Sequence, residues 1–139
     1  MNSRPYSTPP PGRTSWWRKL TAFGAALALF GGAASAQCTF GTLYTSFVAP
    51  GVGITSTITT CQYAGEYNAI SGITAGYQYT LNGNSGIAYC TVHEGSPAGP
   101  VIGFGPTPLA VTATASGSFY PHWSTNAACG TQTGCKTTT

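Results

Sequence analysis

Two histidines and a glutamate are the side chains of this sequence best suited to metal-ion or acid–base chemistry. His93 and Glu94 are neighbours, and His122 follows in a later segment. Two imidazoles and a carboxylate can bind zinc or another divalent metal, as in a metal-dependent enzyme or a fragment of a larger secreted enzyme. Adjacent residues of a strand point to opposite faces, however, so His93 and Glu94 would not converge on one ion. We therefore predict no metal site, no cofactor and no catalytic residue, and keep the metal-dependent enzyme as an alternative.

The sequence contains only two carboxylate side chains, Glu66 and Glu94, and no aspartate. The absence of aspartate argues against Ser–His–Asp triads and against carboxylate-rich calcium sites. A glycosidase would need two carboxyl groups about 5–10 Å apart across a sugar, and no spacing in the sequence brings these two together. The carboxylates therefore favour a non-catalytic protein.

Aromatic side chains on an exposed sheet face can stack on sugar rings, and tyrosine and histidine add a polar edge for hydrogen bonding. Such a face would serve a carbohydrate-binding module, or would contact another cell-surface protein. The alternative is that the rings pack in the core or at its rim. The residues that we take as the candidate ligand face are Tyr89, His93, Tyr120 and His122.

All five cysteines lie after residue 36. In an exported chain they meet an oxidising compartment, where disulfides are the default. Zinc is the alternative, but no two cysteines have C-x2-C spacing. We predict a Cys129–Cys135 disulfide, which would close a small polar loop, and a Cys61–Cys90 disulfide. Cys38 is then left over, as a free thiol, an interchain partner or a cysteine that lacks its mate.

The N-terminal segment has the three parts of a secretory signal peptide. Four basic residues precede the apolar run 20–30, and small residues follow, with the sequence Ala-Ser-Ala ending at Ala36. The apolar run is shorter than the roughly 20 residues of a membrane-spanning helix. We predict a signal peptide over residues 1–36, cleaved after Ala36, and a secreted or cell-surface domain over residues 37–139. A retained N-terminal anchor is the alternative.

Charged side chains are sparse after residue 36, where one lysine stands against two glutamates. Binding of nucleic acid depends on clusters of lysine and arginine, and attraction to an anionic membrane surface has the same requirement. Neither nucleic acid nor, after signal cleavage, a membrane is therefore expected as a partner. The low charge and the frequent aromatic residues also argue against intrinsic disorder.

Short runs of β-branched and aromatic residues, separated by glycine and proline, make up most of the sequence after residue 36. No apolar period of 3.6 residues persists, so we expect no helix. Seven or eight short strands favour an all-β fold, an antiparallel, jelly-roll-like β-sandwich stapled by disulfides. The expected strands are 39–48, 54–63, 77–81, 87–93, 101–104, 109–115 and 118–123, with a shorter one at 69–73.

Alternation along two of these strands assigns their faces. Cys90 and Val92 share the side that we expect to point into the core, and Phe119 and Trp123 share the corresponding side of their strand. These small and aromatic apolar residues suit the space between two sheets.

Turn and breaker residues add two expectations. The Asn-Gly pair in segment 82–86 favours a hairpin loop between the strands on either side. Pro121 has no N–H to donate, so we expect strand 118–123 to be an edge strand or to be broken there.

Taken in order, several blocks of the sequence resemble the repeated β-sandwich module of secreted and cell-surface proteins of Bacteroidetes-type bacteria. The blocks are Cys61–Tyr67, Ile70–Thr80, Cys90–Gly95, Gly99–Gly105, Gly117–Asn126 and Cys129–Thr131. The resemblance implies an extracellular jelly-roll-like sandwich in adhesin-like or surface-layer proteins. Family members carry an ordinary strand residue in place of Pro121 and run on past the position of Thr139, so the resemblance implies a truncated member. We expect a structural or adhesive module whose partner is a surface glycan or a cell-surface protein.

Overall fold

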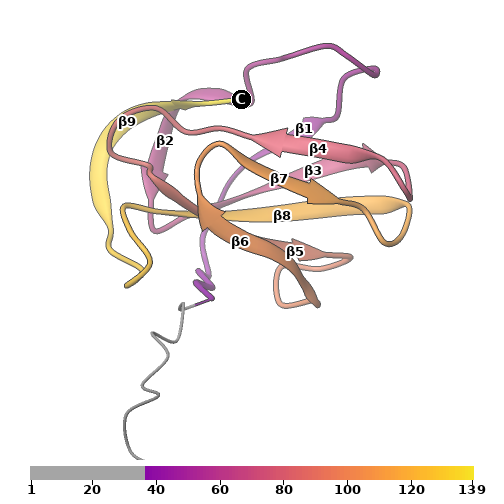
Figure 1. Cartoon of the computed structure of the whole chain (residues 1–139). Coiled ribbons are helices and arrows are strands. Elements are labelled where there is room, and N and C mark those ends of the chain that lie inside the picture. The colour runs from indigo at the N-terminus through magenta and orange to yellow at the C-terminus, as the bar shows by residue number, and fades with distance from the viewer. Residues whose placement is uncertain (1–36) are drawn as a thin grey trace, which may run out of the picture. The chain divides into compact units, whose positions relative to one another are not determined.

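Nine strands and no helix make up residues 37–139, the part of the chain that the computed structural model describes (Figure 1). The predicted signal peptide lies outside the described residues. The strands are β1 (Leu43–Val48), β2 (Thr59–Ala64), β3 (Tyr67–Ile73), β4 (Gln78–Leu81), β5 (Tyr89–Glu94), β6 (Val101–Pro106), β7 (Leu109–Thr112), β8 (Gly117–Ser124) and β9 (Gln132–Thr138). The predicted all-β, disulfide-stapled class is confirmed. The strand that the sequence did not predict is β9.

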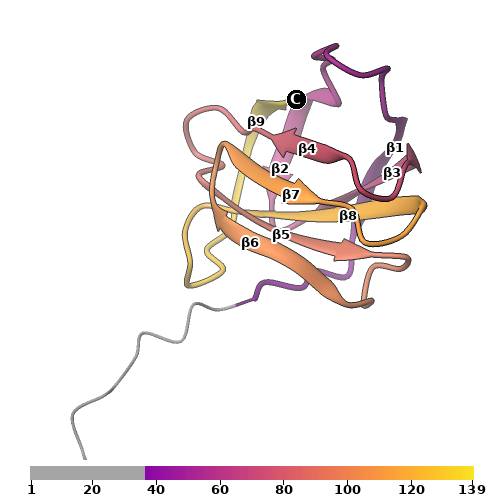
Figure 2. The same cartoon turned by 45° about the vertical axis from the view of Figure 1, so that its right-hand side comes forward.

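The strands form two layers (Figure 2). One layer is a five-stranded sheet in the order β1-β3-β8-β5-β6, in which only the β1–β3 pair is parallel. The other layer consists of the antiparallel pairs β2–β9 and β4–β7. Asn82 and Thr139 join these two pairs, because each donates its N–H to the carbonyl of the other at 2.8 and 2.9 Å.

The predicted hairpin at 82–86 is wrong. Strand β4 pairs with β7, whereas β5 pairs with β6 and β8, so segment 82–86 crosses from one layer to the other. The Asn-Gly pair does permit a change of direction. Side-chain packing decides whether the strands before and after the turn pair with each other, and the turn residues do not encode that packing.

The apolar core lies between the layers. The inward faces predicted for Cys90, Val92, Phe119 and Trp123 are confirmed, since all four are fully buried in one cluster. Burial of each large apolar side chain contributes about 1.5–3 kcal/mol. The polar edge of Trp123 is satisfied, because its indole N–H donates to Asn68 Oδ1 at 2.6 Å.

Pro121 lies in the middle of β8, an interior strand that runs unbroken from Gly117 to Ser124, so the prediction that this strand lies at an edge or breaks at the proline is wrong. Its pairing with β5 is continuous, and Pro121 lies opposite Val92. Its pairing with β3 skips from Tyr67↔His122 to Ile70↔Phe119, so the ladder is interrupted where the proline has no N–H. The missing donor is thus confined to one side of the strand.

Both predicted disulfides are wrong. The structure links Cys38 to Cys129 and Cys61 to Cys135. Cys61 and Cys135 meet because β2 pairs with β9, and the extended course of β9 carries Cys135 away from Cys129. Cys90 is free and buried in the core, and this burial raises the pKa of its thiol. The disulfides join residues 91 and 74 positions apart, and each disulfide stabilises the fold by about 4.5 kcal/mol in the chain-entropy account.

The thiol chemistry provides a direct test of this connectivity. Iodoacetamide is expected to leave the native protein unlabelled and to modify one cysteine, Cys90, after unfolding without a reductant. Peptide mapping under the same conditions should recover the Cys38–Cys129 and Cys61–Cys135 links. A Cys129–Cys135 link, or labelling of the native protein at Cys90, would contradict the structure.

Candidate functional site

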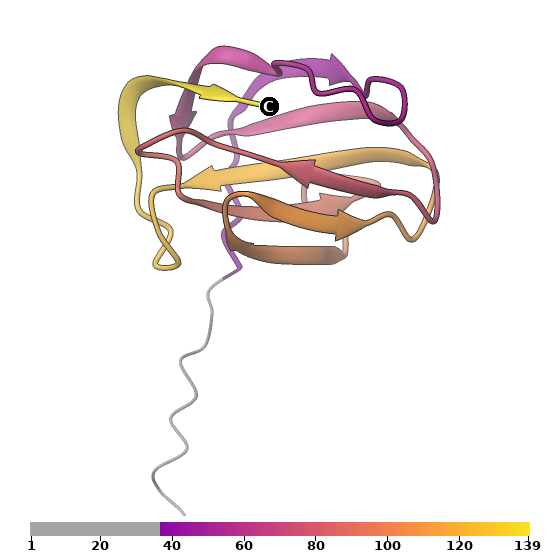
Figure 3. The same ribbon diagram turned by 45° about the horizontal axis from the view of Figure 1, so that its top comes forward.

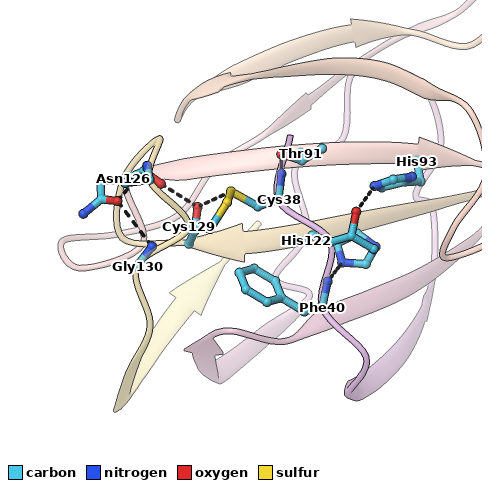
Figure 4. Close-up of a disulfide and its surroundings, with 11 residues drawn as sticks. Cys38, Phe40, Thr91, His93, His122, Asn126, Cys129 and Gly130 are labelled. Carbon is cyan, nitrogen blue, oxygen red and sulfur yellow. Dashed lines mark hydrogen bonds between the residues drawn. A yellow bond between two sulfur atoms is a disulfide. The ribbon is translucent and has the colours of Figure 1, made fainter. Parts of the chain in front are cut away.

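The candidate ligand face on β5 and β8 is covered by the first residues of the described chain (Figure 4). The Cys38 N–H donates to Thr91 Oγ1 at 3.0 Å, and the Phe40 N–H donates to His122 Nδ1 at 2.8 Å. This N-terminal segment, residues 38–40, is held in place by the disulfide from Cys38 to Cys129.

The loop between β5 and β6 covers the same two histidines from another side. A carbonyl oxygen only accepts hydrogen bonds, so His93 Nδ1–H donates to Gly99 O at 2.7 Å and His122 Nε2–H donates to Pro97 O at 3.0 Å. In the neutral rings the remaining nitrogens accept, His93 Nε2 from the Thr39 hydroxyl at 3.2 Å and His122 Nδ1 from Phe40. Every nitrogen of both imidazoles therefore has a partner.

The loop backbone is fixed closely enough to hold these carbonyls in position. Only glycine fits at Gly99, because a Cβ there would collide with the carbonyl oxygen of Glu94. The rings of His93 and His122 meet edge to face with centroids 4.7 Å apart, and Tyr67 stacks on His122 at 4.9 Å. The pair thus joins the N-terminal segment to the β5–β6 loop.

This environment keeps His122 neutral. Burial and, second, the neighbouring His93 lower its pKa from 6.5 to about 4, although the hydrogen bond to Pro97 opposes the shift. In the neutral ring the lone pair of Nδ1 already accepts the hydrogen bond from the Phe40 N–H, so it is not free to bind a metal ion. Among residues 37–139, no three His, Cys, Asp or Glu side chains gather where they could hold a metal ion.

The candidate ligand face is therefore corrected. Tyr89, His93 and His122 are buried, and Tyr120 is half-buried. Alternation placed these residues correctly on the side of β5 and β8 that points away from the core. That side is covered by protein, so it does not offer exposed rings to a sugar.

Glu94 points away from His93, as the alternation predicts, and stabilises the loop between β7 and β8. Its carboxylate accepts from the N–H groups of Thr114 and Ala115 at 2.9 and 3.1 Å, and from the Thr114 hydroxyl. Burial raises the pKa of Glu94, but these three hydrogen bonds outweigh it and hold the pKa below its ordinary value. The carboxylate is thus committed to a structural role.

The two carboxylates do not form a glycosidase pair. Glu66 accepts a backbone hydrogen bond from Trp123, whereas Glu94 lies opposite Phe119, four residues away along β8. Glu66 and Glu94 lie on opposite sides of β8, so two interstrand spacings of about 4.8 Å add to the four residues at about 3.3 Å each, and their backbones are about 16 Å apart. This spacing is too large for two carboxyl groups to act on one glycosidic bond.

An open apolar groove on the other side of the molecule was not predicted. Its volume is about 940 Å³, and it lies between the five-stranded sheet, β4 and the loop of residues 50–56. Phe47, Ile70 and Ile73 form its floor, and no Asp, Glu, Lys, Arg or His side chain lines it. Its volume falls in the range of about 300–1,000 Å³ typical of ligand sites.

Exposed apolar side chains surround this groove. Val52 is 83% exposed and Ile54 62% exposed in the loop, and half of the Tyr77 side chain is exposed at the start of β4. The predicted strand 54–63 begins too early, because β2 starts at Thr59 and Ile54 belongs to the loop that borders the groove. The groove, lined by uncharged residues, is the candidate functional site.

The chain matches no protein-family model, no curated protein and no solved structure at a significant level. Within residues 37–139 there is no helix of the length and apolar character needed to cross a membrane.

Acid should destabilise the fold through His122. Its pKa is lower in the folded chain than in the unfolded chain, so the unfolded state binds more protons between pH 6.5 and about 4, and stability falls as the pH drops through this window. The loss is about 2 kcal/mol after an allowance for solvent screening. In urea unfolding, His122→Asn should be less stable than the parent at pH 7.5 but should decline less from pH 6.5 to 4. Equal slopes for the two proteins would contradict the buried neutral ring.

Glu94 should act at lower pH. Its pKa is lowered in the folded state, so its stabilising contribution is present above the ordinary carboxyl pKa and is lost as the pH falls through the folded value. Glu94→Gln should lose about 1–3 kcal/mol of stability at pH 7, because an amide cannot accept all three hydrogen bonds. Below pH 4 its urea midpoint should approach that of the parent. A constant difference at every pH would show that Glu94 is protonated in the fold.

Proposed function

We propose that the chain is a secreted or cell-surface β-sandwich module with a structural or adhesive role and no catalytic activity. The observation that carries this proposal is that the few side chains able to do chemistry are engaged in hydrogen bonds within the fold. His93, His122 and Glu94 are all buried, and their hydrogen bonds go to backbone groups and threonine hydroxyls of the fold itself. A fold that uses these groups to hold its own loops is suited to presenting a rigid surface.

Two disulfides support the extracellular setting, because such bonds form and persist in oxidising compartments. Cleavage after Ala36 would leave Gln37 as the first residue, directly before Cys38, whose bond to Cys129 would then secure the new N-terminus. The predicted leader and the disulfide pattern are thus consistent with each other.

The adhesive surface that we propose is the apolar groove. Scattered apolar side chains are normal on a protein surface, but contiguous ones around a hollow mark interaction sites. Its exposed side chains, Val52, Ile54 and Tyr77, would be covered by a partner with an uncharged, apolar contact surface. An adhesive role is also what the resemblance to Bacteroidetes-type surface modules implies.

Export can be tested with the full chain in a bacterial host. After fractionation, the protein should be found outside the cytoplasm with Gln37 as its N-terminal residue and with two disulfides. An Ala36→Asp variant is the matched control, because a charged side chain at the cleavage site should leave the leader attached. A cytoplasmic product that keeps Met1 and carries five reduced thiols would overturn the proposal.

A further inference from the structure

We propose that the groove is an acceptor for a β-strand. Its occupant is an extended, uncharged segment of a partner protein, whose backbone pairs with the open edge of β4 and whose alternate side chains cover the apolar floor. This inference rests on the proposed adhesive role and specifies the class of partner.

The backbone of β4 has one unpaired edge. Strand β7 is the only strand with which residues 78–81 form a ladder among the described residues. The Ala113 N–H donates to the Tyr77 carbonyl at 3.0 Å, so Tyr77, Tyr79 and Leu81 turn their backbone groups toward β7. By the same alternation, the N–H and C=O groups of Gln78 and Thr80 point to the opposite edge, into the groove.

The position of an added strand is set by β9. Asn82, the next residue with the same orientation as Thr80, exchanges both of its backbone hydrogen bonds with Thr139. Strand β9 runs antiparallel to this segment, and its end lies beside the arrowhead of β4 in all three views (Figure 3). A segment that follows the same line would next lie opposite Thr80 and then opposite Gln78.

Ile70 and Ile73 are almost fully buried, but two apolar side chains beside this position are covered only in part. Over the rest of the five-stranded sheet, apolar residues pack against β4, β7 and segment 82–88, with Leu81, Ile87 and Val111 fully or almost fully buried. At the groove, Phe47 and Tyr79 are only partly buried. Successive side chains of an inserted strand point alternately to the floor and to solvent, so every second residue would fill this space.

The uncharged lining selects the chemistry of the occupant. No charged side chain lines the groove, so a charged side chain of the occupant would lose its hydration there without meeting a side chain of opposite charge. A purely apolar small molecule would leave the backbone groups of Gln78 and Thr80 without hydrogen-bond partners. Proteins protect open edges with lysine, proline, a bulge or a short strand, and β4 (Gln-Tyr-Thr-Leu) is short but has no lysine, proline or bulge. An added strand without charged side chains avoids the loss of hydration and gives the backbone groups of Gln78 and Thr80 hydrogen-bond partners.

The first experiment extends the exported, oxidised protein beyond Thr139. Appending Val-Thr-Val-Thr-Val-Thr should place valines opposite Leu81 and Tyr79, facing the floor, and should raise Tm by about 5 °C or more. The matched control, Thr-Val-Thr-Val-Thr-Val, has the same composition but is shifted by one residue, which turns the valines to solvent. Its Tm should stay within about 1 °C of the parent. Equal Tm values for the two extensions would overturn the proposal.

The second experiment uses a free peptide, acetyl-Val-Thr-Val-Thr-Val-Thr-amide with a fluorescent label. It should bind the parent protein saturably in a 1:1 ratio, and should bind at least tenfold more weakly when alternate residues are N-methylated. The protein with the in-register extension should not bind it, whereas the control extension should. Equal binding of the methylated peptide would contradict strand pairing.

A second copy of this chain is another occupant to examine. If the parent protein dimerises with increasing concentration and the in-register extension abolishes the dimer, the occupant is a second copy, and the proposal of a partner protein is overturned. A monomeric parent that binds the peptide supports it. These measurements use purified, folded protein, so their failure would leave the export and the disulfides of the proposed function untouched.

Discussion

The Cys38–Cys129 disulfide holds the first described residues against strands β5 and β8, and the interior of the molecule depends on this contact. Because residues 38–40 lie there, His93 and His122 are buried, and each ring nitrogen needs a partner. The N-terminal segment supplies two of these partners, and the β5–β6 loop supplies the other two. A disulfide between distant segments therefore holds His122 in the buried environment that lowers its pKa.

This arrangement makes the two faces of the fold different. The outer side of β5 and β8 is closed by the N-terminal segment, so its histidines and tyrosines are part of the structure. In the second layer, the described residues form two separate pairs, β2–β9 and β4–β7. The apolar groove and the open edge of β4 lie where these pairs meet, and we propose that an extended chain binds there.

Local patterns in the sequence predicted the class of fold and several of its faces. Alternation placed Cys90 and Trp123 in the core correctly. This prediction depends only on which side of each strand is apolar, and not on which strands pair. Alternation could not distinguish solvent from a covering segment, so His122 was assigned to a ligand face. Strand β9 was missed because Gly134 and two threonines around Cys135 resemble a polar loop. The disulfides and the groove depend on which strands are adjacent, and spacing along the chain does not contain that information.

Hydrogen exchange of single backbone amides measures the central claim, that the fold itself supplies the hydrogen-bond partners of His93 and His122 but leaves one edge of β4 open. The account predicts slow exchange for Phe40, whose N–H donates to His122, and for Tyr79 and Leu81, which pair with β7. It predicts fast exchange for Gln78 and Thr80. Protection of Gln78 and Thr80 equal to that of Tyr79 and Leu81, or rapid exchange at Phe40, would contradict it.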